Sequence, residues 1–148
     1  MTRIAALTLF VLLSSLTQAA AQDQLQYPID VAAAEDGTIY IPDPRVPGLW
    51  KLADGELTML AQGTSMFRTP LNAIRCVSVG RDGTIYAGDS ATRDVYRVSP
   101  EGELTPLTDG AIGIPVDIAE DSAGNLYVTD TELHRVWRVS KDGGEPTS

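Results

Sequence analysis

The sequence predicts an all-β protein built from three copies of one unit. Three segments match position by position, and they read EDGTIYIPD at residues 35–43, RDGTIYAGD at 81–89 and SAGNLYVTD at 122–130. The match continues downstream through Leu49-Trp50-Lys51, Val95-Tyr96-Arg97 and Val136-Trp137-Arg138. No apolar period near 3.6 residues persists for the length of a helix. These observations together indicate stacked repeats of short strands.

The second unit shows the expected order of strands most clearly. An apolar run at 74–79 is followed by a turn at 81–83 and by a β-branched and aromatic run at 84–87. A polar loop at 89–94 leads into a third strand at 95–98, and a glycine turn opens a fourth strand at 103–107. The third unit stops at Gly143-Gly144-Glu145, so we expect it to lack its fourth strand.

Units of this size match the blades of a β-propeller, with blades at about 28–63, 72–110 and 114–148. Blades stack around an axis because a single small sheet cannot bury both of its faces. A propeller usually closes with four to eight blades, so three blades make only part of a ring. Two interpretations stay open. The chain is part of a longer six-bladed protein, or two copies form a homodimer through their open blade edges.

The repeated string Gly-x-hydrophobic-Tyr-x-x-Asp, followed by a strand of the type Val-Trp/Tyr-Arg-Val, resembles the NHL-repeat family of six-bladed propellers. It is similar, more distantly, to gluconolactonase/regucalcin and strictosidine-synthase-like propellers. The resemblance covers residues 28–143 and implies the fold, while such propellers serve as binding platforms, lyases and hydrolases alike. The family's Asn and Arg after the Asp are mostly absent. Arg135 stands at the Arg position, where the other units have Asp94 and Gly48.

The N-terminus has the pattern of a signal peptide at residues 1–21. Arg3 precedes an apolar run at 4–16, and Ala19-Ala20-Ala21 supplies the small residues for cleavage before Gln22. An apolar run this short does not reach across a bilayer, so we expect no stable membrane insertion. The sequence therefore predicts an exported protein, periplasmic or extracellular.

The charge balance excludes nucleic acid as a partner. The chain has 20 acidic residues against 11 basic ones, for a formal net charge of −9. Binding of phosphates needs a clustered patch of Lys and Arg, and the basic residues here are scattered. A small molecule or a protein is the partner that we expect.

Ligands of propellers bind where the axis opens on a face built of loops. Here those loops are 62–72 and 109–115 between units, and 43–48, 89–94 and 130–135 within them. The candidate ligand-binding residues on this face are Phe67, Arg68, Asn72, Arg75, Arg93 and His134. In an alternative interpretation, Met66 and Phe67 simply plug a gap between blades. The only histidine, His134, is a candidate general base, and Arg75 is a candidate assisting group.

A second group of candidates lies at the start of the innermost strands, where Asp30, Cys76 and Asp117 align. Carboxylates that converge on an axis are rarely buried unpaired, so Asp30 and Asp117 indicate a cation, a polar ligand or a salt bridge to Arg75. Oxygen ligands favour Ca²⁺ or another divalent cation over zinc. We expect Cys76, in an apolar run, to be a buried strand residue.

A third column, Asp43, Asp89 and Asp130, recurs in every unit. This regularity indicates a structural rather than a catalytic role for these residues. Each Asp can accept backbone N–H bonds in its own loop, or pair with Lys51, Arg97 or Arg138. The sequence thus favours a binding or interaction module. The alternative is a metal-dependent gluconolactonase-like hydrolase or lyase with its site at the channel mouth.

Overall fold

The structure, a computed structural model, describes residues 25–148, which form β-strands and loops without a helix. The strands are β1 (Ala32–Ala33), β2 (Ile39–Asp43), β3 (Gly48–Ala53), β4 (Glu56–Gln62), β5 (Ile74–Val79), β6 (Ile85–Asp89), β7 (Asp94–Val98), β8 (Leu104–Pro106), β9 (Pro115–Glu120), β10 (Asn125–Asp130) and β11 (Arg135–Ser140). The predicted all-β class is confirmed.

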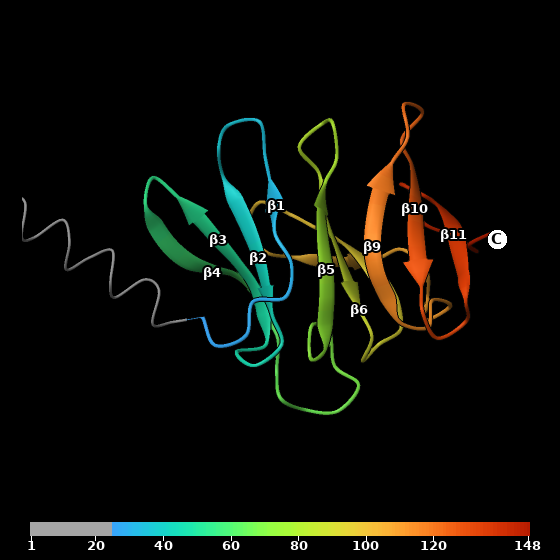
Figure 1. The fold of residues 1–148 in the computed structure, drawn as a ribbon, viewed down its shortest axis with the longest axis horizontal. Coiled ribbons are helices and arrows are strands. Elements are labelled where there is room, and N and C mark those ends of the chain that lie inside the picture. The colour runs from blue at the N-terminus through green and yellow to red at the C-terminus, as the bar shows by residue number, and fades with distance from the viewer. Residues whose placement is uncertain (1–24) are drawn as a thin grey trace, which may run out of the picture.

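The strands form three antiparallel sheets, which we call blades 1, 2 and 3. Blade 1 has the order β1-β2-β3-β4, blade 2 the order β5-β6-β7-β8, and blade 3 the order β9-β10-β11. In Figure 1 the first strands, β1, β5 and β9, lie toward the viewer, and the later strands of each sheet recede behind them. Strand β5 contacts both β9 and β2, so neighbouring blades meet along their inner strands.

Blade 3 lacks a complete fourth strand, as the sequence predicts, but the end of the chain returns to its edge. Two backbone hydrogen bonds join Arg138 and Thr147, with N···O distances of 2.6 and 3.0 Å. In blade 2 the matching residue of the third strand, Arg97, pairs with Thr105 of β8. Thr147 therefore stands where a fourth strand begins.

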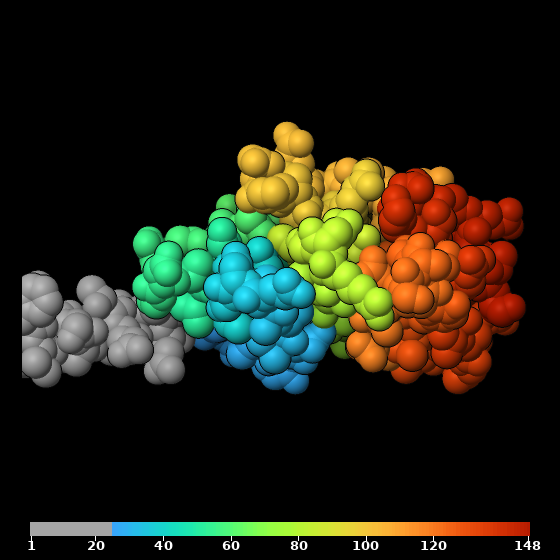
Figure 2. All heavy atoms as spheres, turned by 90° about the horizontal axis from the view of Figure 1, so that it is seen from above, coloured from blue at the N-terminus to red at the C-terminus, as the bar shows by residue number. Residues whose placement is uncertain are grey.

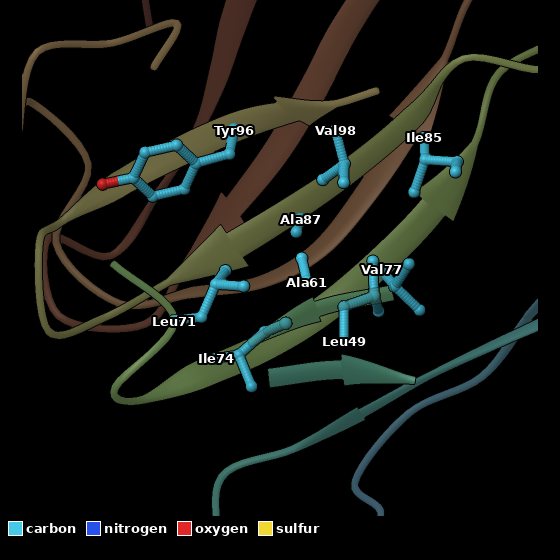
Figure 3. Close-up of a cluster of buried hydrophobic side chains, with 9 residues drawn as sticks. All are labelled: Leu49, Ala61, Leu71, Ile74, Val77, Ile85, Ala87, Tyr96 and Val98. Carbon is cyan, nitrogen blue, oxygen red and sulfur yellow. The ribbon is translucent and has the colours of Figure 1, made fainter. Parts of the chain in front are cut away.

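Two clusters of buried apolar side chains hold the blades together, one at each junction. The first joins blades 1 and 2 and consists of Leu49, Ala61, Leu71, Ile74, Val77, Ile85, Ala87, Tyr96 and Val98 (Figure 3). The second joins blades 2 and 3 and consists of Cys76, Tyr86, Val95, Leu107, Ile112, Ile118, Leu126, Val128 and Val139. Neighbouring residues along a strand point to opposite faces of the sheet, so blade 2 buries both of its faces.

The two terminal blades each keep one face that no other blade covers in the described chain. Register places Ile39, Ile41, Trp50 and Leu52 together on the face of blade 1 that points away from blade 2. On the uncovered face of blade 3, which points away from blade 2, Tyr127 and Val136 are 39% and 51% exposed. Seen from above, the blades follow one another in chain order from one end of the molecule to the other (Figure 2).

The described sheets run over residues 32–62, 74–106 and 115–140, within the three predicted blade ranges. The predicted signal peptide at 1–21 lies outside the described residues. Within residues 25–148, no helix is long and apolar enough to cross a membrane.

Gly88 of β6 lies where blade 2 meets blade 3, and a side chain there would collide with its neighbours. A Cβ atom on Gly88 would lie 2.6 Å from Cys76 Sγ and 2.9 Å from Pro115 Cβ. We expect Gly88→Ala to lower the free energy of unfolding by about 2 kcal/mol, because overpacking must separate the two blades. Urea denaturation followed by tryptophan fluorescence measures the loss.

The matched control is Thr129, which holds the equivalent position in β10. Thr129 faces no further blade in the described chain, and its buried hydroxyl has no hydrogen-bond partner there. Thr129→Ala should change the free energy of unfolding by less than about 0.5 kcal/mol. Equal losses in the two variants would contradict the overpacking explanation.

Candidate functional site

Each blade carries a buried aspartate at the end of its second strand that ties two loops together. In blade 2 this residue is Asp89, whose side chain is fully buried. Its carboxylate accepts the Ala73 N–H at 2.9 Å from the loop before β5. It also accepts the Ala91 and Thr92 N–H groups and the Thr92 hydroxyl from the loop before β7. One side chain thus fixes the loop that enters the blade and the loop that follows β6.

The same arrangement recurs in the other two blades. Asp43 accepts the backbone N–H groups of Gln26, Tyr27, Arg45 and Val46. Asp130 accepts those of Gly113, Ile114, Glu132 and Leu133, together with the indole N–H of Trp137. Burial acts to raise the pKa of Asp130, but the indole and backbone donors outweigh it and hold this pKa well below its usual range. The predicted structural role of this column is confirmed, through backbone bonds rather than ion pairs.

The clamped loops gather at one edge of the blades, the lower edge in Figure 1, together with the connection between β4 and β5. This edge is the predicted loop face. The longest segment on it spans residues 63–73, and its turn is closed by hydrogen bonds of its own. The Thr64 and Thr69 hydroxyls lie 2.7 Å apart, the Thr69 hydroxyl donates to Met66 O, and the Asn72 amide donates to Thr64 O at 2.8 Å.

This closed loop displays large apolar side chains outward. The side chains of Met66 and Phe67 are 67% and 81% exposed. The Arg68 guanidinium lies over the Phe67 ring, 5.3 Å from its centroid. The interpretation in which these residues plug a gap between blades is therefore wrong. Of the predicted binding residues, Phe67 and Arg68 stand together at the tip, whereas Asn72 holds the loop closed.

The remaining loop-face candidates are engaged locally rather than converging on one point. Arg93 makes a salt bridge to Glu132, with an N–O distance of 2.8 Å, that links blade 2 to blade 3. His134 is exposed and occupies the same turn position as Arg93, and both have a left-handed backbone, with φ of 52° and 62°. Their shared position indicates a role in turn geometry.

Asp30 and Asp117 lie close enough to Cys76 for their charges to act on its thiol, as the alignment of these three residues predicts. Burial, with smaller contributions from these two carboxylates, raises the pKa of Cys76 to about 12, so the thiol stays protonated. Asp30 accepts the Val77 N–H at 2.9 Å across the junction of blades 1 and 2, and Asp117 accepts the N–H of Ile118. The prediction that Cys76 is buried in a strand is confirmed.

The salt bridge expected between Arg75 and this inner column does not form between the described residues. Arg75 is exposed and donates to the Ser90 hydroxyl at 3.2 Å, and it forms no salt bridge to either aspartate in the described part of the chain. The cause is an irregularity in β5, where Arg75 is the unpaired residue of a register shift between Ile74 and Cys76. Among residues 25–148 no group of three or more His, Cys, Asp or Glu side chains is placed to hold a metal ion. Asp30 and Asp117 alone supply fewer oxygen ligands than Ca²⁺ takes, so a cation site there stays a prediction that needs further ligands.

The structure contains hollows that the sequence did not indicate, at the opposite edge of the blades. Two adjoining clefts of about 420 and 530 Å³ lie between blades 1 and 2, beside the hairpin turns. Tyr40, Asp82 and Gly83 line both of them, and Lys51 lines the smaller one. The sequence does contain one difference between repeats at this edge, because Val79 in the second unit aligns with Glu120 in the third.

Solved structures share this architecture. A virginiamycin B lyase from Staphylococcus aureus aligns with a TM-score of 0.66 at 20% identity, over 80% of this chain and 39% of its own length. A gluconolactonase from Xanthomonas campestris aligns with a TM-score of 0.68 at 16% identity, over 83% of this chain and 47% of its own. A chain of a nidogen/laminin complex gives 0.69 at 22% identity, with 81% and 46% covered.

These similarities confirm the predicted partial β-propeller. No family model and no curated protein matches the chain. The chain spans less than half the length of each of these three structures. At such identities the fold alone is shared.

The low pKa of Asp130 predicts that acid destabilises the protein, because protonation of this carboxylate removes acceptors for its hydrogen bonds. A carboxyl group whose pKa is depressed by folding stabilises the fold above its unfolded pKa of about 3.8, and this stabilisation is lost as the pH falls toward the folded value. We therefore expect the free energy of unfolding to fall as the pH is lowered from about 4 to 2, because in this range the unfolded chain binds a proton on Asp130 that the folded chain does not. Urea titrations at a series of pH values measure this slope.

Asp130→Asn should make the free energy of unfolding less dependent on pH over this range. It should also lower that free energy by about 3 kcal/mol at neutral pH, because the amide cannot accept all five hydrogen bonds. Asp142→Asn is the control, since Asp142 makes only an exposed ion pair with Lys141. That variant should lose less than about 0.5 kcal/mol. An unchanged pH slope in Asp130→Asn would contradict the assignment.

Proposed function

We propose that the chain is an exported, NHL-like propeller module that binds a small molecule or a protein through its loop face. The segment at 1–21, with its short positive start and apolar run, supports export to the periplasm or the extracellular space. The acidic net charge of −9 disfavours nucleic acid as the partner. The module works as a scaffold, because the repeated aspartates fix its loops before any ligand arrives.

The observation that carries this proposal is the loop at 63–73. Large apolar side chains are normally buried, yet Met66 and Phe67 are displayed at its tip while hydrogen bonds from Thr64, Thr69 and Asn72 hold the turn closed. A rigid loop that presents an aromatic ring with a guanidinium over it loses little entropy on binding. Such a tip suits a partner with an apolar surface and a nearby acidic group.

We infer further that the ring of blades is completed by other blades, and that this chain is part of a longer six-bladed protein. The support is the apolar outer face of blade 1 and the exposed Tyr127 and Val136 on blade 3. The alternative is a homodimer, in which the outer face of blade 3 of each copy covers blade 1 of the other. Light scattering separates the two, because a discrete dimer would favour the second interpretation.

We expect peptides selected on this chain to bind the loop at 63–73. A phage-displayed peptide library panned against the chain should yield aromatic or acidic peptides whose affinity falls at least tenfold in Phe67→Ser, which corresponds to about 1.4 kcal/mol. Titration calorimetry of the selected peptides measures the change.

The control is Val136→Ser, which removes another exposed apolar side chain on a different surface. It should leave the affinity of the selected peptides unchanged. Peptides that bind Phe67→Ser as well as the unmodified chain would contradict the proposed binding tip.

A second candidate function, that of a metal-dependent gluconolactonase-like hydrolase or lyase, is favoured by the names of two similar structures. The candidate residues are Asp30 and Asp117 as ligands, with His134 or Arg75 assisting. If the binding module is the function, Ca²⁺ and a chelator should leave the melting temperature unchanged, and the chain should not accelerate hydrolysis of glucono-δ-lactone. Calcium-dependent stabilisation together with lactone hydrolysis would favour the enzyme instead.

A further inference from the structure

The hairpin edge of the molecule has two junctions between blades, and only one of them is closed. At the junction of blades 2 and 3, Glu120 of β9 reaches across and accepts the Arg81 N–H at 2.8 Å. Tyr86 of blade 2 lies near Glu120 and is only 1% exposed. One glutamate thus seals the space between two hairpins.

The junction of blades 1 and 2 lacks this seal. The residue of blade 2 that corresponds to Glu120 is Val79, which has no group to accept the N–H of Glu35, the counterpart of Arg81. Tyr40, the counterpart of Tyr86, is correspondingly left half-buried. The clefts of about 420 and 530 Å³ open at this place, with Tyr40 in the wall of both. Because the same fold closes the other junction, this opening arises from the sequence of blade 2.

Two hydrogen-bond donors stand side by side in the cleft. Tyr40 and Lys51 are directly opposite each other on β2 and β3, and both line the smaller cleft. Within residues 25–148 the Tyr40 hydroxyl makes no hydrogen bond, and the Lys51 ammonium has no carboxylate oxygen within 4.0 Å. Burial and the nearby Asp36 raise the pKa of Tyr40, so its hydroxyl keeps its proton. An adjacent ammonium and hydroxyl match the two oxygens of a carboxylate.

The rest of the lining limits the ligand to a singly charged one with an apolar part. Leu60 and the ring of Tyr40 offer apolar surface beside the two donors. Asp36 lines the larger cleft and Asp82 lines both, and each already accepts a backbone N–H, from Thr38 and Thr84 respectively. In the smaller cleft the charged lining residues are Lys51, Asp82 and Arg97, with a formal sum of +1, which favours a single carboxylate over a dianion such as phosphate.

We propose that the cleft between blades 1 and 2 is a binding site for a monocarboxylate with a compact apolar body. The carboxylate accepts hydrogen bonds from Lys51 and Tyr40, and the apolar body packs on Leu60 and the Tyr40 ring. This site is separate from the loop face and does not depend on the function proposed for it. Both of its walls come from described residues, so the chain itself is sufficient for the test.

The probe is phenylacetate, titrated into the ¹⁵N-labelled chain and followed by NMR. We expect saturable shifts confined to amides beside the cleft, such as those of Tyr40, Gly83 and Thr84. Phenylacetamide has the same shape without the charge and should bind about tenfold more weakly, and acetate, which lacks the apolar body, should bind more weakly still.

Two variants test the site directly. Lys51→Gln should weaken phenylacetate about tenfold, because it removes the charged donor. Val79→Gln places an amide oxygen where Glu120 stands in the next junction, so it should accept the Glu35 N–H, occupy part of the larger cleft and weaken phenylacetate at least tenfold. Arg138→Gln is the matched control, since Arg138 is the residue of blade 3 that aligns with Lys51. The affinity of this variant for phenylacetate should be unchanged.

Three results would overturn the proposal. These are the absence of saturable binding by phenylacetate, equal affinity for phenylacetate and phenylacetamide, and undiminished binding by Val79→Gln. The NMR spectrum of each variant shows whether it is folded. If Val79→Gln fails to fold, Lys51→Gln and the probe series still decide the outcome.

Discussion

The buried aspartate at the end of each second strand is the contact on which the rest of this structure depends. A carboxylate without solvent is costly unless donors surround it, and here four or more donors converge on Asp43, Asp89 and Asp130. Those donors come from two separate loops, so satisfying the charge also fixes the loops relative to the sheet. Asp89 also holds Ala73, the last residue of the loop at 63–73 that displays Phe67.

Sequence repetition determines the scaffold, and departures from repetition determine where binding is expected. The clamps, the paired second and third strands and the glycine turns recur because each blade meets the same packing problem. The extra residues of the loop at 63–73 occur once, and so does Glu120, whose position is held by Ala33 and Val79 in the other two units. Asp94 is a third such departure, because it is buried and binds Thr108 and Gly110, where the other blades have Gly48 and Arg135.

The sequence could predict the order of strands, the burial of Cys76 and the structural role of the repeated aspartates. Alternation of apolar residues and turn residues are local properties, and repetition makes them visible. The candidate site was harder to predict, because it depends on which side chains meet across blades. A register shift in β5 leaves Arg75 unpaired and exposed, and Glu132 binds Arg93, and neither outcome follows from local sequence. The cleft was missed for a related reason, since Val79 is informative only once Glu120 is known to seal the other junction.

A partial ring restricts which sites the chain can form by itself. A site on the central axis draws its ligands from every inner strand around the ring, and here Asp30 and Asp117 are the carboxylates that the inner column supplies. A site on one loop or between two adjacent blades has no such requirement, because all of its walls are present. The Phe67 tip needs one clamp, and the cleft beside Tyr40 needs only blades 1 and 2. Binding at these two places is therefore compatible with either way of completing the ring, whereas chemistry on the axis requires the blades that complete it.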